Sequence, residues 1–367
     1  MSFSVRDLAT PGVRALQPYQ PGKPLSELER EYGISGAIKL ASNENPLGPS
    51  PLGLAAAREA LAEVELYPDS HGFALKQALS AALGVGADQL VLGNGSNEIL
   101  QLVARAFLNP GDEVVVAQYA FAIFTTEAVS AGGRVVTVPA KDWGADLPAM
   151  RAAVTERTRL IFLANPNNPT GTWHRAAELL AFLEALPEHV VVVLDEAYCE
   201  YVSEPDYPNG LAWLARFPNL LVSRTFSKIY GLAGLRLGYG VASVEMADLL
   251  NRLREPFSVN NLALAAGAAA LADEAHVTRS RELNAQGLAE LAAACQRLGL
   301  DFIPSVGNFI AVDVGRPAGP VYEALLRQGI IVRPLAPYGM PRHLRITIGT
   351  PAQMQRLLAA LPKALAA

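Results

Sequence analysis

The most regular feature of the sequence is a series of short apolar runs between residues 89 and 241. The runs are rich in β-branched residues and continuously apolar, which is typical of strands buried on both faces. Helical stretches separate most of them, for example Asn97–Leu108, Arg175–Leu186 and Val244–Arg254. The runs themselves are Gln89–Leu92, Glu113–Ala117, Arg134–Val138, Arg159–Ala164, Val190–Leu194, Leu220–Ser223 and Arg236–Val241. This alternation predicts an α/β fold whose large domain has a mainly parallel sheet covered by helices.

The two ends of the chain depart from this pattern. The first 40 residues are rich in proline and turns, and they predict an N-terminal arm with one short helix near Ser26–Tyr32. After about residue 275 we expect a smaller C-terminal α/β domain that begins with a long helix near Val277–Leu298. Its other expected elements are strand Phe309–Val314, helix Pro320–Gln328, strands Ile330–Arg333 and Leu344–Ile348, and a closing helix. The predicted boundaries are therefore 1–45 for the arm, which could wrap the body or a partner subunit, 46–275 for the large domain and 276–367 for the small domain.

Composition narrows the classes of function. The chain has 367 residues, 51% of them hydrophobic and 18% charged, which suits about two folded domains. A net charge of −5 leaves no basic excess to neutralise phosphates, so nucleic-acid binding is not expected. The sequence contains no long uncharged apolar run, so a membrane span is not expected, and its N-terminal segment lacks the apolar stretch of a signal peptide. Two cysteines, Cys199 and Cys295, favour a cytoplasmic location, and the five histidines lack the spacing of metal ligands.

Four polar segments each fall at the end of a predicted strand. Because ligands bind at the carboxyl ends of strands in open parallel sheets, these segments are candidates for a site. The first segment is Gly93-Asn94-Gly95-Ser96-Asn97-Glu98. Ser96 is expected to cap the next helix, whose N-terminal amides could cradle a phosphate. Taken alone, the same residues are better explained by an ordinary capped turn, because such turns between a strand and a helix are common.

The second and third segments supply an amide and a carboxylate. The second is Asn165-Pro166-Asn167-Asn168-Pro169-Thr170-Gly171, where fixed proline φ angles would hold the asparagine amides at the sheet edge. The third is Asp195-Glu196-Ala197-Tyr198, directly after five apolar residues. Burying Asp195 is costly without a cationic partner. That partner could be an arginine of the chain or a cationic ring nitrogen of a cofactor.

The fourth segment, from Ser223 to Tyr239, places a lysine among hydroxyl residues. Lys228 could be an exposed loop lysine or an activated amine that attacks a carbonyl carbon. Thr225, Ser227 and Arg236 could together bind a phosphate dianion. Pyridoxal 5′-phosphate requires a reactive lysine, a phosphate anchor and an acid at its ring nitrogen. The four segments together therefore favour a pyridoxal-phosphate site.

At these residues the chain resembles the class I and II, fold type I, pyridoxal-phosphate aminotransferases. The resemblance covers nearly the whole chain and rests on the Asn-Pro-x-Asn-Pro-Thr-Gly run, the Asp-Glu-x-Tyr run and the Ser-Lys-x₇-Arg spacing. Further segments are similar to the histidinol-phosphate aminotransferase branch of that family, namely Pro18–Pro24, Ile38–Gly48, Leu66–Asp69, Ile330–Pro334 and Leu344–Thr350. Asn97 and Ala117 depart from the family, whose members commonly have Asp and Pro there.

The resemblance implies a role for each candidate residue. Lys228 would bind the cofactor covalently and move the substrate proton, and Asp195 would pair with the ring nitrogen. Asn168 and Tyr198 would hydrogen-bond the phenolic oxygen of the ring, and Tyr119 would stack on its face. The further residues implied to contact the cofactor are Gly95, Ser96, Asn97, Thr225, Ser227 and Arg236, together with Tyr67 from the other subunit of a homodimer. The residues implied to bind substrate anions are Tyr19, Asn43, Arg333 and Arg345.

The implied reaction is transamination of L-histidinol phosphate with 2-oxoglutarate, which gives imidazole acetol phosphate and L-glutamate in histidine biosynthesis. An aromatic amino-acid aminotransferase or a threonine-phosphate decarboxylase on the same scaffold is the alternative, and both would keep Lys228. A ligand-sensing regulator belongs to a different class and would need an attached DNA-binding segment. The first 40 residues are too short and too proline-rich to form one. Small-molecule substrates are therefore expected, with no metal, nucleic acid or membrane involved.

Overall fold

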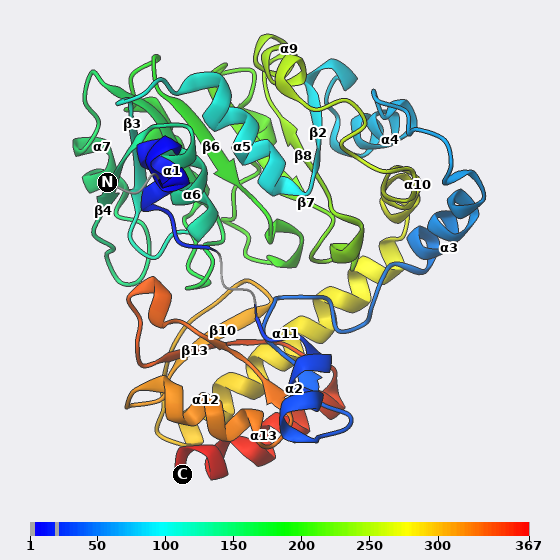
Figure 1. Cartoon of the computed structure of the whole chain (residues 1–367), viewed down its shortest axis with the longest axis vertical. Helices are drawn as coiled ribbons and strands as arrows, with labels where there is room; N and C mark the ends of the chain where they lie inside the picture. Colours follow the sequence, from blue (N-terminus) through cyan, green and yellow to red (C-terminus); the bar gives the residue numbers. More distant parts are fainter. Residues whose placement is uncertain (1–3, 19–21, 367) are drawn as a thin grey trace.

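A seven-stranded sheet forms the centre of the larger of two lobes in the computed structural model, which describes residues 4–18 and 22–366 (Figure 1). Its strands are β2 (Leu90–Asn94), β3 (Glu113–Ala117), β4 (Arg134–Val138), β5 (Thr158–Ala164), β6 (Val191–Asp195), β7 (Leu220–Thr225) and β8 (Leu237–Val241). They lie in the order β2-β8-β7-β6-β5-β3-β4, and only β8 runs antiparallel to its neighbours. The predicted mainly parallel sheet is confirmed, with strand ends shifted by at most two residues.

Each face of this sheet is buried under helices, which explains why the strand sequences are continuously apolar. In β3, Val114 and Val116 point into one core, whereas Val115 points into the other. The first core is covered by α5 (Ser96–Phe107), α6 (Ala122–Ser130) and α9 (Val244–Leu253). The second core is covered by α3 (Pro51–Ala60), α4 (Phe73–Leu83), α7 (Leu147–Ala152), α8 (Ala176–Glu184) and α10 (Asn261–Ala270). The rigid sheet thus fixes where its carboxyl-terminal edge lies.

The smaller lobe is built on α11 (Glu274–Arg297), the long yellow helix that joins the two lobes in Figure 1. Its antiparallel sheet has the order β12-β13-β10-β9, with strands β9 (Asp301–Ile303), β10 (Phe309–Asp313), β12 (Arg333–Pro334) and β13 (His343–Thr347). Helices α12 (Ala318–Leu326) and α13 (Pro351–Ala366) share its core with α11. The expected smaller C-terminal α/β unit is therefore present.

The prediction of one strand at Ile330–Arg333 is wrong because the chain changes partner within it. β11 (Ile330–Ile331) pairs in parallel with β1 (Ile38–Lys39), whereas β12 pairs with β13. This switch ties the N-terminal segment to the small lobe. It also places Arg333, the first residue of β12, opposite Arg345 of β13.

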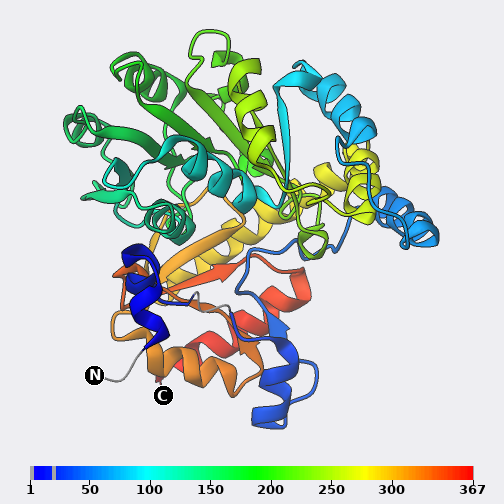
Figure 2. The same ribbon diagram turned by 45° about the horizontal axis from the view of Figure 1, so that its top comes forward.

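The N-terminal arm divides its contacts between the lobes, as the turned view in Figure 2 also shows. α1 (Pro11–Ala15) packs against α6, and α2 (Leu25–Tyr32) buries Leu28 against the small lobe. The expectation of one short helix is wrong, because Pro11 at the first helical position starts a second helix. The boundaries at residues 45 and 275 stay predictions. Within the described residues, no helix is long and apolar enough to cross a membrane.

Candidate active site

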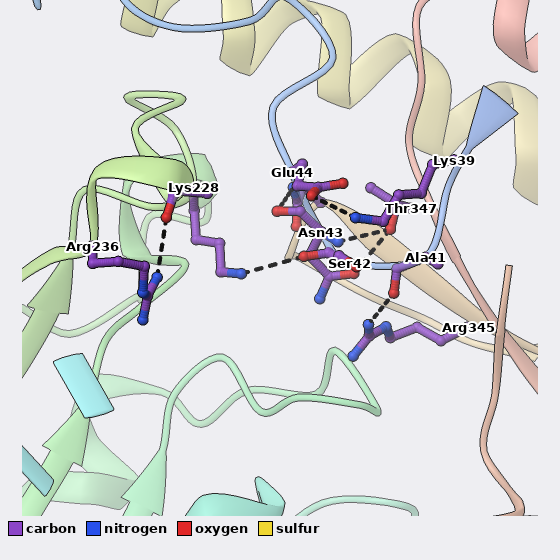
Figure 3. A network of polar contacts seen from close by, with 11 residues as sticks. Lys39, Ala41, Ser42, Asn43, Glu44, Lys228, Arg236, Arg345 and Thr347 are labelled. Atoms are coloured by element: carbon purple, nitrogen blue, oxygen red, sulfur yellow. Dashed lines mark hydrogen bonds and ion pairs between the residues drawn. The ribbon is translucent and has the colours of Figure 1, made fainter. Parts of the chain in front are cut away.

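A cavity of about 260 Å³ lies where the carboxyl ends of the central strands face the small lobe. Three parts of the chain line it: the strand ends of the large lobe, the strands β12 and β13, and the segment 41–44 between β1 and α3. Figure 3 shows Lys228 and Arg236 on one side and the segment Ala41–Glu44 with Arg345 on the other. The predicted site residues that line it are Asn43, Ser96, Asn97, Asn168, Asp195, Tyr198, Thr225, Ser227, Lys228, Arg236, Arg333 and Arg345.

Asp195 ends β6 inside the cavity and is 5% exposed. Its Oδ1 accepts hydrogen bonds from the Ser223 hydroxyl at 3.1 Å and from the Ala197 amide at 3.2 Å. Burial raises the pKa of this carboxyl from 3.8 to about 6, although these hydrogen bonds favour its charged form. The charge of Lys228 also favours the ionised form of this carboxyl. A buried carboxylate that opens into a cavity can pair with a cationic group of a ligand.

Lys228 follows β7 and is half-buried beside Asp195's strand. Its Nζ donates to the Ser42 carbonyl at 3.5 Å and lies 5.5 Å from the centre of the Tyr198 ring (Figure 3). Tyr198 is 4% exposed, and burial raises the pKa of its hydroxyl. The amine and the phenol thus face the same small volume, where an amine can act as nucleophile or base.

Asn43 holds the Tyr198 hydroxyl, and the small lobe in turn holds Asn43. The Asn43 amide Nδ2 donates to Tyr198 Oη at 2.9 Å. The Asn43 backbone N–H donates to Thr347 Oγ1 at 3.0 Å, and that hydroxyl donates back to Asn43 Oδ1 at 3.0 Å. Asn308 Nδ2 donates to the Asn43 carbonyl oxygen at 3.0 Å. Asn43 has a φ of 55°, so this bonding fixes a backbone conformation that non-glycine residues rarely adopt.

Several donors converge at the amino end of α5. Gly95 has a φ of 78°, and a Cβ there would lie 2.5 Å from Arg236 Nη2, so a larger residue would push the guanidinium away. Arg236 Nη1 donates to Ala233 O at 3.1 Å and lies 3.5 Å from Ser227 Oγ. The Ser227 amide donates to Thr225 Oγ1 at 3.1 Å. Hydroxyls, a guanidinium and a helix N-terminus in one place suit a phosphate group.

The expectation that Ser96 caps α5 is wrong. The helix begins at Ser96, and Gly95 occupies the cap position without a side chain to bond the backbone. Because glycine alone takes the left-handed turn easily, the cap falls one residue earlier than the serine suggests. The Ser96 hydroxyl is therefore not used to cap the helix and lines the cavity instead.

The two arginines of the small lobe lie on paired strands. Arg345 of β13 is 6% exposed, and Arg333 of β12 is its register partner. Arg345 Nη1 donates to Asn168 Oδ1 at 2.5 Å, and its Nη2 donates to the Ala41 carbonyl at 2.7 Å. Because the Asn168 carbonyl oxygen accepts from Arg345, the Asn168 Nδ2 is the group left to donate to a ligand.

Three of the predicted residues that the structure describes, Gly95, Tyr67 and Tyr119, are absent from the lining of the cavity. Tyr119, at the end of β3, has its ring 5.3 Å from Trp143 and is absent from the lining. Tyr67 is 82% exposed and stacks on Phe257 at 4.8 Å. Tyr19 lies outside the described residues. Phe121 and Tyr338 also line the cavity, and neither lies in a polar motif that would mark it in the sequence.

The comparisons with known proteins agree with this geometry. A model of the family described as aminotransferase class I and II matches residues 35–361, so the chain belongs to that family. It is 59% identical to histidinol-phosphate aminotransferase 2 of Pseudomonas fluorescens, with 100% of both chains covered. It is 57% identical to histidinol-phosphate aminotransferase 1 of Nitrosococcus oceani, with 96% of both covered. The predicted resemblance, to the family and to this branch of it, is confirmed.

A solved structure shows the same fold. The crystal structure of histidinol-phosphate aminotransferase from Sinorhizobium meliloti in complex with pyridoxal-5′-phosphate matches with a TM-score of 0.90. The two chains are 35% identical, and the match covers 100% of this chain and 98% of that one. The chain is therefore an aminotransferase with the fold type I architecture that the sequence predicted.

Proposed function

We propose that this chain transfers an amino group between L-histidinol phosphate and 2-oxoglutarate, giving imidazole acetol phosphate and L-glutamate, as a step of histidine biosynthesis. The observation that carries the proposal is one cavity that holds an amine, a buried carboxylate and two arginines, namely Lys228, Asp195, Arg333 and Arg345. The relatives named above support the choice of substrate.

Pyridoxal 5′-phosphate is the proposed cofactor, because the residues of the cavity fit its parts. Asp195 is a buried carboxylate that accepts hydrogen bonds and whose ionised form is favoured by the charge of Lys228, so it can serve as the partner of a pyridinium nitrogen. The donors around Gly95 form a concave cradle that a Cβ would fill. The residues proposed to hold the phosphate are Gly95, Ser96, Asn97, Thr225, Ser227 and Arg236. When bound, the cofactor supplies an electron sink next to the substrate carbon that loses its proton.

Lys228 is proposed to bond the cofactor and to move that proton. Its Nζ lies over the Tyr198 ring and within reach of the segment that carries Asn43. A positioned base of this kind contributes about 10²–10⁴-fold to a rate. Tyr198 and Asn168 each retain a donor for the ring oxygen, while Asn43 and Arg345 fix their orientation. Stacking of Tyr119 on the ring stays a prediction.

Arg333 and Arg345 are proposed to bind the anionic end of the substrate together with Asn43 and Tyr19. Two guanidiniums on adjacent strands suit a phosphate dianion, and either of them can pair with the carboxylates of 2-oxoglutarate. One anion site could then serve both substrates in turn. Arg345 is the more deeply fixed of the two, since it also anchors Asn168.

A homodimer is proposed because the large lobe carries an exposed apolar patch around Tyr67. The patch comes from α3, α4 and the turn between them, and its residues are Leu52, Leu54, Leu61, Val64, Leu66, Tyr67 and Phe73. Patches of this kind commonly mark protein interfaces. A two-fold axis would present the same patch from both chains and carry Tyr67 to the partner's cavity. A cytoplasmic location is proposed as well, in line with the two free cysteines.

The transamination can be followed with purified protein and pyridoxal 5′-phosphate in either direction. One direction forms L-glutamate from L-histidinol phosphate and 2-oxoglutarate, and the other consumes L-glutamate. With imidazole acetol phosphate and L-glutamate as substrates, we expect steady release of 2-oxoglutarate. Lys228→Ala should lose at least about a hundredfold of this rate, because the base is gone. Lys363→Ala, on the exposed side of α13, is the control and should keep it. Full activity of Lys228→Ala would contradict the proposal.

A further inference from the structure

The Asp195 carboxylate has two oxygens in different surroundings. Asp195 and Ser223 are register partners on the parallel strands β6 and β7, so their side chains leave the same face of the sheet. Both known donors, the Ser223 hydroxyl and the Ala197 amide, bond Oδ1. Within the described residues Oδ2 accepts no hydrogen bond, and Asp195 lines the cavity. Oδ2 is thus the oxygen available to a ligand.

Ser223 has no other evident purpose in its strand. It is fully buried and follows three apolar residues, Leu220, Leu221 and Val222. An alanine would continue the apolar run at no polar cost, whereas a buried serine hydroxyl requires a partner. Its partner is the carboxylate.

We infer that Ser223 is a positioning residue: its hydroxyl orients Asp195 through Oδ1 and favours the ionised carboxylate, leaving Oδ2 to meet the protonated ring nitrogen of the cofactor. The inference rests on the proposed function. Nothing in the sequence motifs or in the comparisons assigns this role to Ser223.

The charges around Asp195 make a neutral donor important. Burial raises the pKa of the carboxyl, and the Ser223 hydrogen bond is the strongest influence that lowers it. Lys228, on the loop after β7, favours the ionised form, whereas Glu196 opposes it. Glu196 itself is neutralised by Arg224 at 2.6 Å, and the Tyr198 hydroxyl is kept protonated by burial. Ser223 therefore supplies much of what keeps Asp195 charged near neutral pH.

Pyridoxamine 5′-phosphate is the probe for this role, since it carries the ring and phosphate but forms no covalent bond with Lys228. Losing one hydrogen bond to the carboxylate in Ser223→Ala should raise the pKa of Asp195 by about 1, from about 6 to about 7. Above both values the carboxylate is ionised in either protein, so the dissociation constants should agree within about twofold at pH 8.5. Near pH 5–6 the variant must first lose a proton, and its dissociation constant should be about 5- to 10-fold higher than that of the wild type.

Two further variants complete the experiment. Ser280→Ala removes an equally buried hydroxyl whose hydrogen bond is to Asn45, and its ratio to wild type should stay near 1 at every pH. Ser223→Cys keeps the size of the side chain with a weaker donor, so a shift of the same sign should appear even if Ser223→Ala does not fold.

The outcomes separate the two proposals. The quantity compared is the dissociation constant of the variant divided by that of the wild type. If this ratio is the same from pH 5 to pH 8.5 in the Ser223 variants, the role of Ser223 is overturned while the proposed function stays intact. Failure of the wild type to bind pyridoxamine 5′-phosphate at any pH would overturn the proposed function itself. A ratio that grows as the pH falls, in the Ser223 variants but not in Ser280→Ala, is the predicted result.

Discussion

Without its cofactor, the protein should lose stability as the pH rises from about 4 to about 6, and Asp195 should be the cause. Burial raises the pKa of Asp195 from its usual 3.8 to about 6. When the pKa of a carboxyl is higher in the folded than in the unfolded protein, its protonated form stabilises the fold. This stabilisation is complete below the pKa of the unfolded state and is lost as the pH rises through the pKa of the folded state. Each pKa unit corresponds to about 1.4 kcal/mol, so ionising Asp195 costs the cofactor-free fold roughly 3 kcal/mol by pH 8.

Asp195→Asn removes this titration while keeping the size of the side chain. Relative to wild type, the free energy of unfolding of the variant should therefore rise by up to about 3 kcal/mol between pH 4 and pH 8. Urea denaturation of the cofactor-free proteins at each pH measures this difference.

Asp273→Asn is the control of opposite sign. Burial alone would raise the pKa of Asp273, but hydrogen bonds from the Ser50 hydroxyl and the His276 and Leu52 amides lower it overall. Ionised Asp273 therefore stabilises the fold above the pKa that it has in the unfolded state, and this stabilisation is lost as the pH falls. Relative to wild type, Asp273→Asn should be less stable at pH 8 than at pH 3. A difference for Asp195→Asn that does not change between pH 4 and pH 8 would refute the reasoning. Adding pyridoxal 5′-phosphate to the wild type should reduce its loss of stability, because a cationic ring nitrogen offsets the buried charge.

The remaining predictions concern the substrate arginines, the assembly and a second buried carboxylate. Arg345→Ala should lower kcat/KM for histidinol phosphate and for glutamate by roughly 30- to 1,000-fold. Arg333→Ala should lower kcat/KM for histidinol phosphate more than for glutamate. Equal, small losses for both substrates in Arg333→Ala would indicate that Arg333 forms a surface ion pair instead. Sedimentation should show a homodimer that Leu54→Glu dissociates, and an active wild-type monomer at assay concentration would count against the shared site. The Thr155 hydroxyl, together with Arg134 and Arg157, holds the pKa of Glu113 at about 2. Glu113→Gln should therefore be less stable than wild type at pH 7, and the difference in stability should shrink as the pH falls from 4.5 towards 2. A difference in stability that persists at pH 2 would show that the charge of Glu113 is not responsible.

Local sequence carries much of the fold and of the candidate site. The strands of the large sheet were predictable because both of their faces are buried, which makes their sequences continuously apolar. Asp195, Asn168 and Lys228 stood out because each follows such a run with a polar group. Since parallel strands end at one edge, these residues had to lie near one another, and they do line one cavity.

What the sequence could not show depends on contacts between distant segments. The split of Ile330–Arg333 into two strands reflects a pairing with residues 38–39, which no local pattern reveals. Thr347 fixes Asn43 across the two ends of the chain. Ser223 looked like the end of a strand until the register placed it beside Asp195. Tyr338 enters the cavity from a short turn between two strands, where neither period nor motif marks it.

The central claim is that this cavity selects a substrate with a phosphate. It is tested most directly by measuring kcat/KM side by side for L-histidinol phosphate, L-phenylalanine and L-tyrosine with 2-oxoglutarate as the acceptor. Two guanidiniums hold a phosphate dianion better than a single carboxylate, so histidinol phosphate should exceed either amino acid by at least about tenfold. Arg333→Ala should narrow that margin. An equal or higher kcat/KM for phenylalanine or tyrosine would contradict the account and make the chain an aromatic amino-acid aminotransferase.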